Sequence, residues 1–246
     1  MISGPELFGR YAFPPNVLGY CGPSDSGLTE GLVSSEATRE LAHIVEQFEG
    51  AWPYLELIGG LSGLDPLDAR VVEAYWIGNE LLDDLDMLTW GNSVDERFRA
   101  RSGGSWSTVA TGIADGAPNH AFHVFCVYPW VGLLRSGYAD HALEVIDRCR
   151  IRWGVIESSV GSEVVVRSSP LRWDGVALTL GSPVTETVSG SFDLTTHAPG
   201  TVVSLHWDYI CDELDPRQLR HLQQQTSRHL SIVNASGRDV ADVLER

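Results

Sequence analysis

Cysteines and basic residues are both scarce in this 246-residue chain, and it has no long apolar run. Cys21, Cys126, Cys149 and Cys211 are too few and too scattered for a disulfide framework, so we expect free thiols in a reducing compartment. The 17 basic residues against 33 acidic ones give a net charge of -16, which disfavours nucleic acids and anionic membrane surfaces as partners. No segment approaches the roughly 20 apolar residues of a membrane span, and the start lacks the layout of a signal peptide. These absences predict a cytoplasmic protein with neither a nucleic-acid nor a membrane partner.

The hydrophobic pattern changes near residue 148. Before this point apolar residues recur at helical spacing, and after about residue 150 short segments rich in Val, Thr and Ser alternate with turn residues. We therefore predict an α+β protein with two domains. Residues 1–148 would form a helical bundle, and residues 149–246 a small OB-like β-barrel that ends in a C-terminal helix.

Caps and prolines place the individual elements. Helices are expected at 35–47, from Pro53, from Asp65-Pro66 through Leu81, after the capping box at 93–96, at 120–134 with distortion by Pro129 and Gly132, at 139–148, and from Asp215-Pro216. Strands are expected at 154–157, 163–168, 176–180, 184–188 and 202–206, with Gly161 among the turn residues. The stretch up to about residue 33 is expected to be irregular.

The first candidate site is the pair Cys149 and His206. Cys149 would open the barrel segment and His206 would close it, so that thiolate and imidazole would meet on one rim. Sulfur and nitrogen donors suit a transition metal. Arg148, Arg150 and Arg152 surround the cysteine, and we expect their field to favour the thiolate. The alternative is a small buried cysteine at a helix end and a histidine that is hydrogen-bonded at a strand end.

Cys149 is followed by four residues, Gly154 and a strand; Pro199-Gly200 then leads to a strand that ends in His206, an apolar stretch and Asp215. In this order, and in the spacing from Cys149 to Gly154, residues 149–233 resemble the HypC/HybG/HupF family of NiFe-hydrogenase maturation chaperones. One departure is that Cys149 is internal and not N-terminal. Another is that Trp153 stands where the family has proline, and the interval to His206 is several residues longer.

The resemblance implies a function. By this likeness Cys149 and His206 would hold iron as an Fe(CN)2CO unit, and the partner would be a hydrogenase large subunit or another maturation protein. The N-terminal part also looks like an uncharacterised bacterial family associated with hydrogenase gene clusters, through segments such as 8–12, 19–23, 52–56 and 122–125. We therefore expect an accessory protein that assembles a metallocentre and needs no catalysis of its own.

A second constellation supports a competing hypothesis. His120, His123 and Cys126 recur every three residues on a predicted helix, and Cys21 in a glycine-flanked turn would complete a four-ligand set. The same segment is otherwise apolar, as in a core helix. The competing hypotheses are thus a metal-dependent enzyme with its site in the helical domain, and a metal-free interaction protein.

Overall fold

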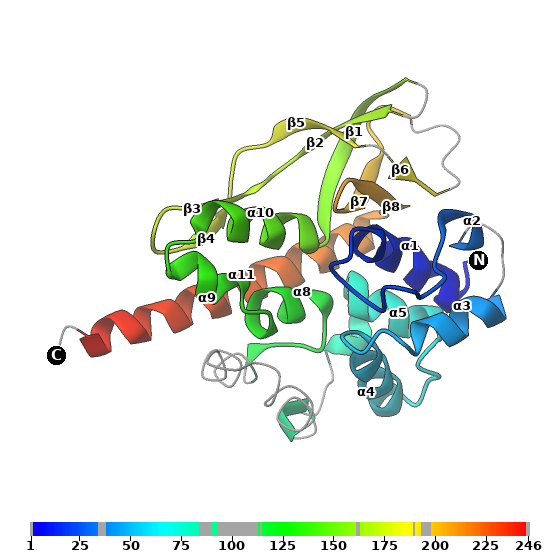
Figure 1. Cartoon of the computed structure of the whole chain (residues 1–246), viewed down its shortest axis with the longest axis horizontal. Coiled ribbons are helices and arrows are strands. Elements are labelled where there is room, and N and C mark those ends of the chain that lie inside the picture. The colour runs from blue at the N-terminus through cyan, green and yellow to red at the C-terminus, as the bar shows by residue number, and fades with distance from the viewer. Residues whose placement is uncertain are drawn as a thin grey trace.

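The computed structural model describes residues 2–33, 38–83, 90–92, 113, 115–160, 163–188, 190–192 and 198–244. Helices fill most of the N-terminal part, sheets follow, and one long helix ends the chain. Figure 1 shows the large sheet on one side of a helical layer. The fold is therefore the mixed helix and sheet arrangement expected from the change of pattern near residue 148, with its helices first and its strands second.

The N-terminal helices pack around a shared apolar interior. They are α1 (Gly4–Val17), α2 (Glu30–Val33), α3 (Thr38–Val45), α4 (Trp52–Ser62), α5 (Ala69–Trp76), the 3-10 turn η1 (Glu80–Leu82), α8 (His120–Phe122), the π-helical turn η3 (His123–Val127), α9 (Trp130–Arg135) and α10 (Ala139–Cys149). Their buried members include Phe8, Tyr54, Trp76 and Phe122. The helices expected from Pro53 and at 139–148 are confirmed. The capping box at 93–96 lies outside the described residues, as does Ser35.

Helix α1 corrects the expectation that the first 33 residues are irregular. Ser3 caps it by accepting a hydrogen bond from the Glu6 amide at 3.4 Å, although Pro14 and Pro15 lie inside the helix. Its apolar residues are buried on most sides, so the segment lacks the one-sided pattern by which an amphipathic helix is found. Hydrophobic periodicity therefore does not predict a helix that is buried on most of its sides.

Two other expected helices differ in detail. The Asp65 carboxylate accepts from the Leu67 amide at 2.8 Å in a turn, and the next helix begins only after the cap Asp68. The expected helix at 120–134 is broken, because Tyr128 has an extended ψ of 144° before α9 begins. Pro129 follows directly, and the residue before a proline avoids the helical region.

The large sheet has six strands in the order β5-β2-β1-β7-β8-β6. They are β1 (Arg152–Val160), β2 (Glu163–Ser168), β5 (Val184–Val188), β6 (Gly190–Ser191), β7 (Val202–His206) and β8 (Tyr209–Glu213), whereas β3 (Leu171–Trp173) and β4 (Leu178–Leu180) form a separate pair. All neighbours are antiparallel except β6 and β8. Among the described strands β5 and β6 remain edges, so the sheet is open and an OB-like barrel is not confirmed. The turn predicted at Gly161 is not described.

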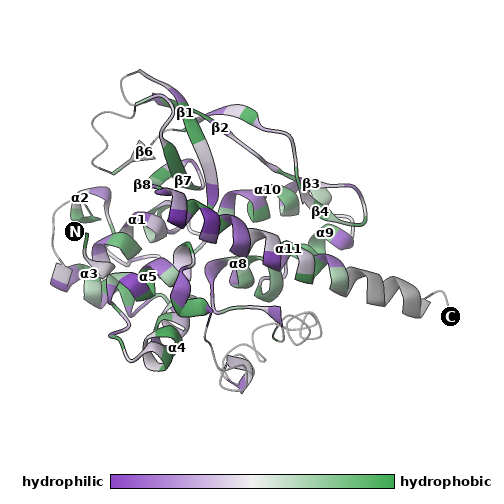
Figure 2. Cartoon of the chain, turned by 180° about the vertical axis from the view of Figure 1, so that it is seen from behind, coloured by the Kyte–Doolittle hydropathy of each residue, from purple (hydrophilic) through white to green (hydrophobic). Residues whose placement is uncertain are grey.

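Helix α11 (Pro216–Leu244) ends the structure. The Asp215 carboxylate accepts from the Arg217 amide at 2.7 Å and the Gln218 amide at 2.8 Å, which confirms the predicted cap. Figure 2 shows the helix in front of the other elements, with a largely hydrophilic ribbon near its start. Leu222, Leu230 and Val233 face the core. No helix in the described part of the chain has the length and apolar character of a membrane span.

One large core joins the two parts of the chain. It includes Phe8 and Trp76 from the helices, Cys149 at the junction, and Trp207 and Val233 beyond it. A second, smaller cluster lies on the sheet and includes Ile156, Val166 and Leu205. The division predicted at residue 148 therefore coincides with the end of α10, and the core continues across it.

Candidate metal centre

His120 is positioned by the residue before it. Asn119 is 1% exposed, caps α8, and donates its side-chain amide to the carbonyls of Ala74 and Tyr75, both at 2.9 Å. These bonds fix the start of α8 against the end of α5. The imidazole of His120 consequently lies beside Trp76, with ring centroids 4.6 Å apart.

Cys149 is the last residue of α10, not the first of a strand. It lies on the same helical face as Ala142, Val145 and Ile146, and this spacing turns it toward the core. Cys149 is 6% exposed. Cys149 is therefore a buried thiol at the point where the helical part passes into the sheet.

His206 ends β7 and precedes a tight connection to β8. Trp207 has a φ of 55°, an uncommon conformation for a residue with a large side chain. Its amide donates to the Arg148 carbonyl at 2.9 Å, which ties the connection to the last turn of α10. This bond brings His206 to the end of the helix that carries Cys149.

The three side chains form one cluster. One ligand atom of each of His120, Cys149 and His206 lies within 4.8 Å of the others. The histidine rings are 5.2 Å apart at an angle of 74°. Within the described residues this is the one group of three or more potential ligands that meets this distance.

The hydrogen bonds define which ring nitrogens carry protons. His206 Nδ1 is 2.6 Å from the Tyr11 carbonyl, and His120 Nε2 is 2.9 Å from the Cys149 carbonyl. A carbonyl only accepts, so both nitrogens donate. In the neutral rings His206 Nε2 and His120 Nδ1 then carry lone pairs. Tyr75 Oη lies 3.3 Å from His120 Nδ1 and is oriented to donate to it.

His206 Nε2 is a buried acceptor without a hydrogen-bond partner. Such a group costs about 1–3 kcal/mol when it is left unsatisfied. Metal-ligating histidines commonly donate their second nitrogen to a carbonyl, as His206 does to Tyr11. His206 Nε2 is therefore the ring nitrogen of this cluster that is open to a metal, whereas both nitrogens of His120 already have hydrogen-bond partners.

Burial keeps all three groups uncharged without a metal. Desolvation lowers the pKa of His120 to about 4 and the pKa of His206 well below its usual range, where the neighbouring His120 lowers it further. Desolvation also raises the pKa of the Cys149 thiol, and Cys21 adds to that rise. Neutral imidazoles are the ligand form, whereas the thiol must lose its proton when it binds.

The expectation that arginines favour the Cys149 thiolate is wrong. Arg148 binds Asp208, Arg150 lies 2.8 Å from Asp147, and Arg152 lies 2.5 Å from Glu186. Each guanidinium is thus paired with a carboxylate. Their fields are largely neutralised, and burial of the sulfur dominates its pKa.

The structure divides the alternative set of Cys21, His120, His123 and Cys126. His120 joins Cys149 and His206, whereas His123 Nδ1 lies 3.1 Å from Tyr54 Oη and lines a pocket. Cys126 is buried, and desolvation raises its pKa to about 12. Among the described residues these four do not gather their ligand atoms within 4.8 Å.

The sequence did not predict that His120 of the second candidate set joins Cys149 and His206 of the first. His120 and Cys149 are 29 residues apart, and the bond that joins them runs from a ring to a backbone carbonyl. Tyr11 also acts through its carbonyl, for which no residue type is a signal. Asn119, directly before His120, is a residue type that favours helix caps, and this is a sequence signal for the start of α8 at His120.

The fold and the site define a mixed α and β protein that buries a His/Cys/His cluster where its helices meet its sheet. Residues 1–239 match DUF6390, a family of unknown function, and the chain belongs to this family. The match covers both the helical part and the sheet, so the cluster lies wholly within it. No curated protein and no solved structure matches the chain.

Proposed function

We propose that this protein holds a transition-metal ion at His120, Cys149 and His206, as an accessory protein in metallocentre assembly. The observation that carries the proposal is the buried, unpartnered Nε2 of His206, which lies in a group whose ligand atoms are within 4.8 Å of one another. Its Nδ1 is already held by the Tyr11 carbonyl at 2.6 Å. The ring is thus oriented as a ligand before any metal arrives.

The donor set indicates which metals are suitable. Two imidazoles and one thiolate bind zinc and iron, and three protein ligands leave a further position for a ligand from outside. This set of ligand atoms suits either metal. The choice of iron rests on the resemblance of the segment around Cys149 and His206 to the hydrogenase maturation chaperones, in which the corresponding pair holds Fe(CN)2CO.

The finer proposal is a role in NiFe-hydrogenase maturation. Iron would be the cargo, with its diatomic ligands at the open position, and a hydrogenase large subunit or another maturation protein would be the partner. His120 would supply a third protein ligand in place of one from a partner. Because Cys149 is 6% exposed, this protein would hold its cargo more tightly enclosed than a chaperone with a terminal cysteine.

The test is isolation of the protein without oxygen from its native host, followed by iron analysis and infrared spectroscopy. We expect cyanide and carbonyl bands that are lost in Cys149→Ala and kept in Cys126→Ala, the control at another buried thiol. Loss of hydrogenase maturation in Cys149→Ala cells would accompany them. Wild-type protein without iron and without these bands would refute the maturation role.

A metal-dependent enzyme is the second candidate. A site with three protein ligands and one open position is also the arrangement of catalytic zinc centres. Stoichiometric zinc that is lost in Cys149→Ala, together with no diatomic bands, would favour this reading over the maturation role. The competing hypothesis placed the enzyme site around His123 and Cys126, and zinc lost in His123→Ala but kept in Cys149→Ala would favour that location.

A further inference from the structure

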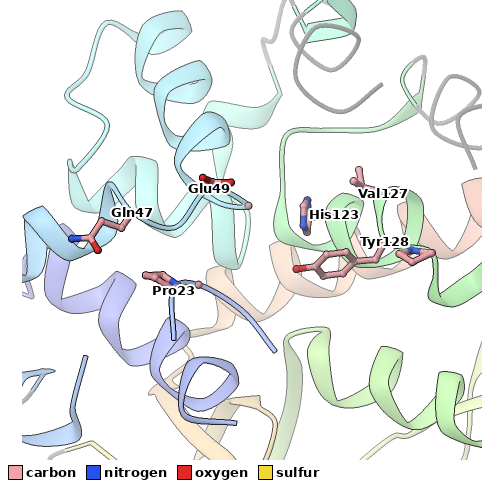
Figure 3. Close-up of a pocket in the computed structure, with 9 residues that line it drawn as sticks. Pro23, Gln47, Glu49, His123, Val127 and Tyr128 are labelled. Carbon is pink, nitrogen blue, oxygen red and sulfur yellow. The ribbon is translucent and has the colours of Figure 1, made fainter. Parts of the chain in front are cut away.

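A pocket of about 490 Å³ opens between the N-terminal helices and the segment around η3. Its lining residues are Gly22, Pro23, Gln47, Glu49, Gly50, His123, Val127, Tyr128 and Pro129. In Figure 3, His123 and Tyr128 lie together on one side, and Pro23, Gln47 and Glu49 lie across from them. The pocket therefore combines a carboxylate, an imidazole and a phenol at one opening.

Cys21 adds a thiol next to this pocket. It precedes the lining residue Gly22 and shares a hydrogen bond with the side chain of Tyr128, whose ring is 4.4 Å from that of His123. It is partly exposed, whereas the other three cysteines of the chain are buried. Cys21 is thus the thiol that a metal ion from solvent would meet first.

Two lines of contact run from the pocket to the metal cluster. In the first, Tyr20, which precedes Cys21, stacks on Trp207 with ring centroids 4.2 Å apart, and the Trp207 amide donates to the carbonyl of Arg148, which precedes Cys149. In the second, His123 contacts Tyr54 at 3.1 Å, Tyr54 and Tyr75 have ring centroids 5.4 Å apart, and Tyr75 contacts His120 at 3.3 Å. The Tyr54 and Tyr75 side chains therefore connect the pocket residue His123 with the cluster residue His120.

We infer that this pocket is the loading route for a divalent metal ion, with Glu49 and His123 as first contacts and Cys21 as the relay ligand to Cys149. The inference rests on the proposed metal site. A net charge of -16 and the Glu49 carboxylate attract cations to the opening. Imidazole and thiolate donors then suit zinc, iron or cobalt.

The transfer step involves no change of oxidation state. The metal binds the Cys21 sulfur as that thiol gives up its proton to water. The bond to Cys21 then breaks and the bond to Cys149 forms; Cys21 takes a proton back, and Cys149 releases one. The net result is one proton released for each metal bound, because Cys21 ends as the thiol and Cys149 as the thiolate.

The test is rapid mixing of metal-free protein with Co2+ under anaerobic conditions, followed through the thiolate-to-cobalt absorption. We expect Cys21→Ser and Glu49→Gln each to lower the rate of metal loading by roughly tenfold. This is at the low end of the change in association rate that electrostatic steering can cause. Final absorption should equal that of the wild type. Cys126→Ala and Glu46→Gln are the matched controls, and both should load at the wild-type rate.

The outcomes separate this inference from the proposed site. Wild-type loading rates in both Cys21→Ser and Glu49→Gln, with full final absorption, would overturn the loading route and leave the cluster intact. A wild-type protein without a thiolate-to-cobalt band would instead overturn the metal site itself. Slower loading to the same final absorption supports the route.

Discussion

His206 has one ring nitrogen fixed and the other left without a partner. The Tyr11 carbonyl holds Nδ1 at 2.6 Å, and Nε2 lies buried beside the Cys149 and His120 side chains. Because desolvation lowers the pKa of both histidines, both rings are neutral near neutral pH, and the Nε2 lone pair of His206 is open whereas Nδ1 of His120 accepts from Tyr75. This open nitrogen is the observation that supports the proposed metal site.

The first prediction concerns the sulfur ligand. Cys149→Ala should weaken metal binding by at least roughly 100-fold, because loss of a direct ligand exceeds the 10- to 100-fold effect of losing its supporting partners. Titration of metal-free protein with Zn2+ against a competing chelator measures this change. Cys126→Ala, at a buried thiol outside the cluster, should bind as the wild type does, and equal weakening by the two variants would contradict the assignment.

At the residue scale, the sequence pattern indicates part of the cluster that the structure brings together. Cys149 and His206 were singled out as a pair, and the structure places their ligand atoms within 4.8 Å. His120 was assigned to a different set, because helical spacing links it with His123 and Cys126. Its actual position depends on the bonds from Asn119 to the end of α5, which are tertiary contacts without a sequence pattern.

At the scale of elements, the position of His206 depends on α1. Hydrophobic periodicity did not predict this helix. It supplies the Tyr11 carbonyl to His206, and it packs on α5, which carries Tyr75 and Trp76. The strands at 163–168, 184–188 and 202–206 were predicted with their observed bounds. β8 was missed, because its alternating pattern is interrupted by acidic residues next to a short turn.

The second prediction tests how the start of α1 packs against the segment around Leu67. A Cβ at Gly4 would come within 1.9 Å of the Leu67 carbonyl oxygen, so Gly4→Ala must displace the helix start. We expect about 1–3 kcal/mol of destabilisation, as for other overpacked sites. Denaturant unfolding measures it, and weaker metal binding should accompany it because Tyr11 lies on the same helix.

The matched control is Gly60→Ala in α4. Nothing lies within 4 Å of a Cβ at this exposed helical position. Removing a glycine from a helix interior should stabilise by about 0.5–1 kcal/mol. If both variants shifted stability in the same direction, the close approach of α1 to Leu67 would not be the cause.

At the scale of the whole molecule, one core unites the helical part and the sheet, and the cluster of His120, Cys149 and His206 lies where they join. The mixed α and β composition and the order of helices before strands followed from periodicity and turn residues. Whether the sheet closes into a barrel could not be predicted in this way, because closure depends on which strand edges pair. The described strands leave β5 and β6 as edges, an outcome that local patterns do not encode.

The third prediction is a loss of stability in acid. Desolvation lowers the pKa of His120 and His229 from an ordinary 6.5 to about 4, and it lowers the pKa of His206 well below its ordinary value. The unfolded chain therefore binds more protons than the folded one below pH 6.5, and the free energy of unfolding falls as pH drops toward 4. Each histidine contributes a slope of about 1.4 kcal/mol per pH unit in this window.

Urea unfolding of metal-free protein between pH 7 and pH 4.5 isolates this slope. His229→Gln removes one buried histidine away from the cluster and should flatten the slope by about 1.4 kcal/mol per pH unit. His43→Gln, at an exposed histidine, should leave the slope unchanged. An unchanged slope in His229→Gln would mean that burial of that ring is not linked to acid instability.

The most direct measurement of the central claim is X-ray absorption at the zinc or iron edge of the metal-loaded protein. The site predicts one sulfur at about 2.3 Å and two imidazole nitrogens at about 2.0–2.1 Å for zinc. In Cys149→Ala the sulfur contribution should disappear, and in His206→Ala one imidazole should be lost. A first shell of oxygen alone, or a sulfur contribution that persists in Cys149→Ala, would contradict a metal centre at His120, Cys149 and His206.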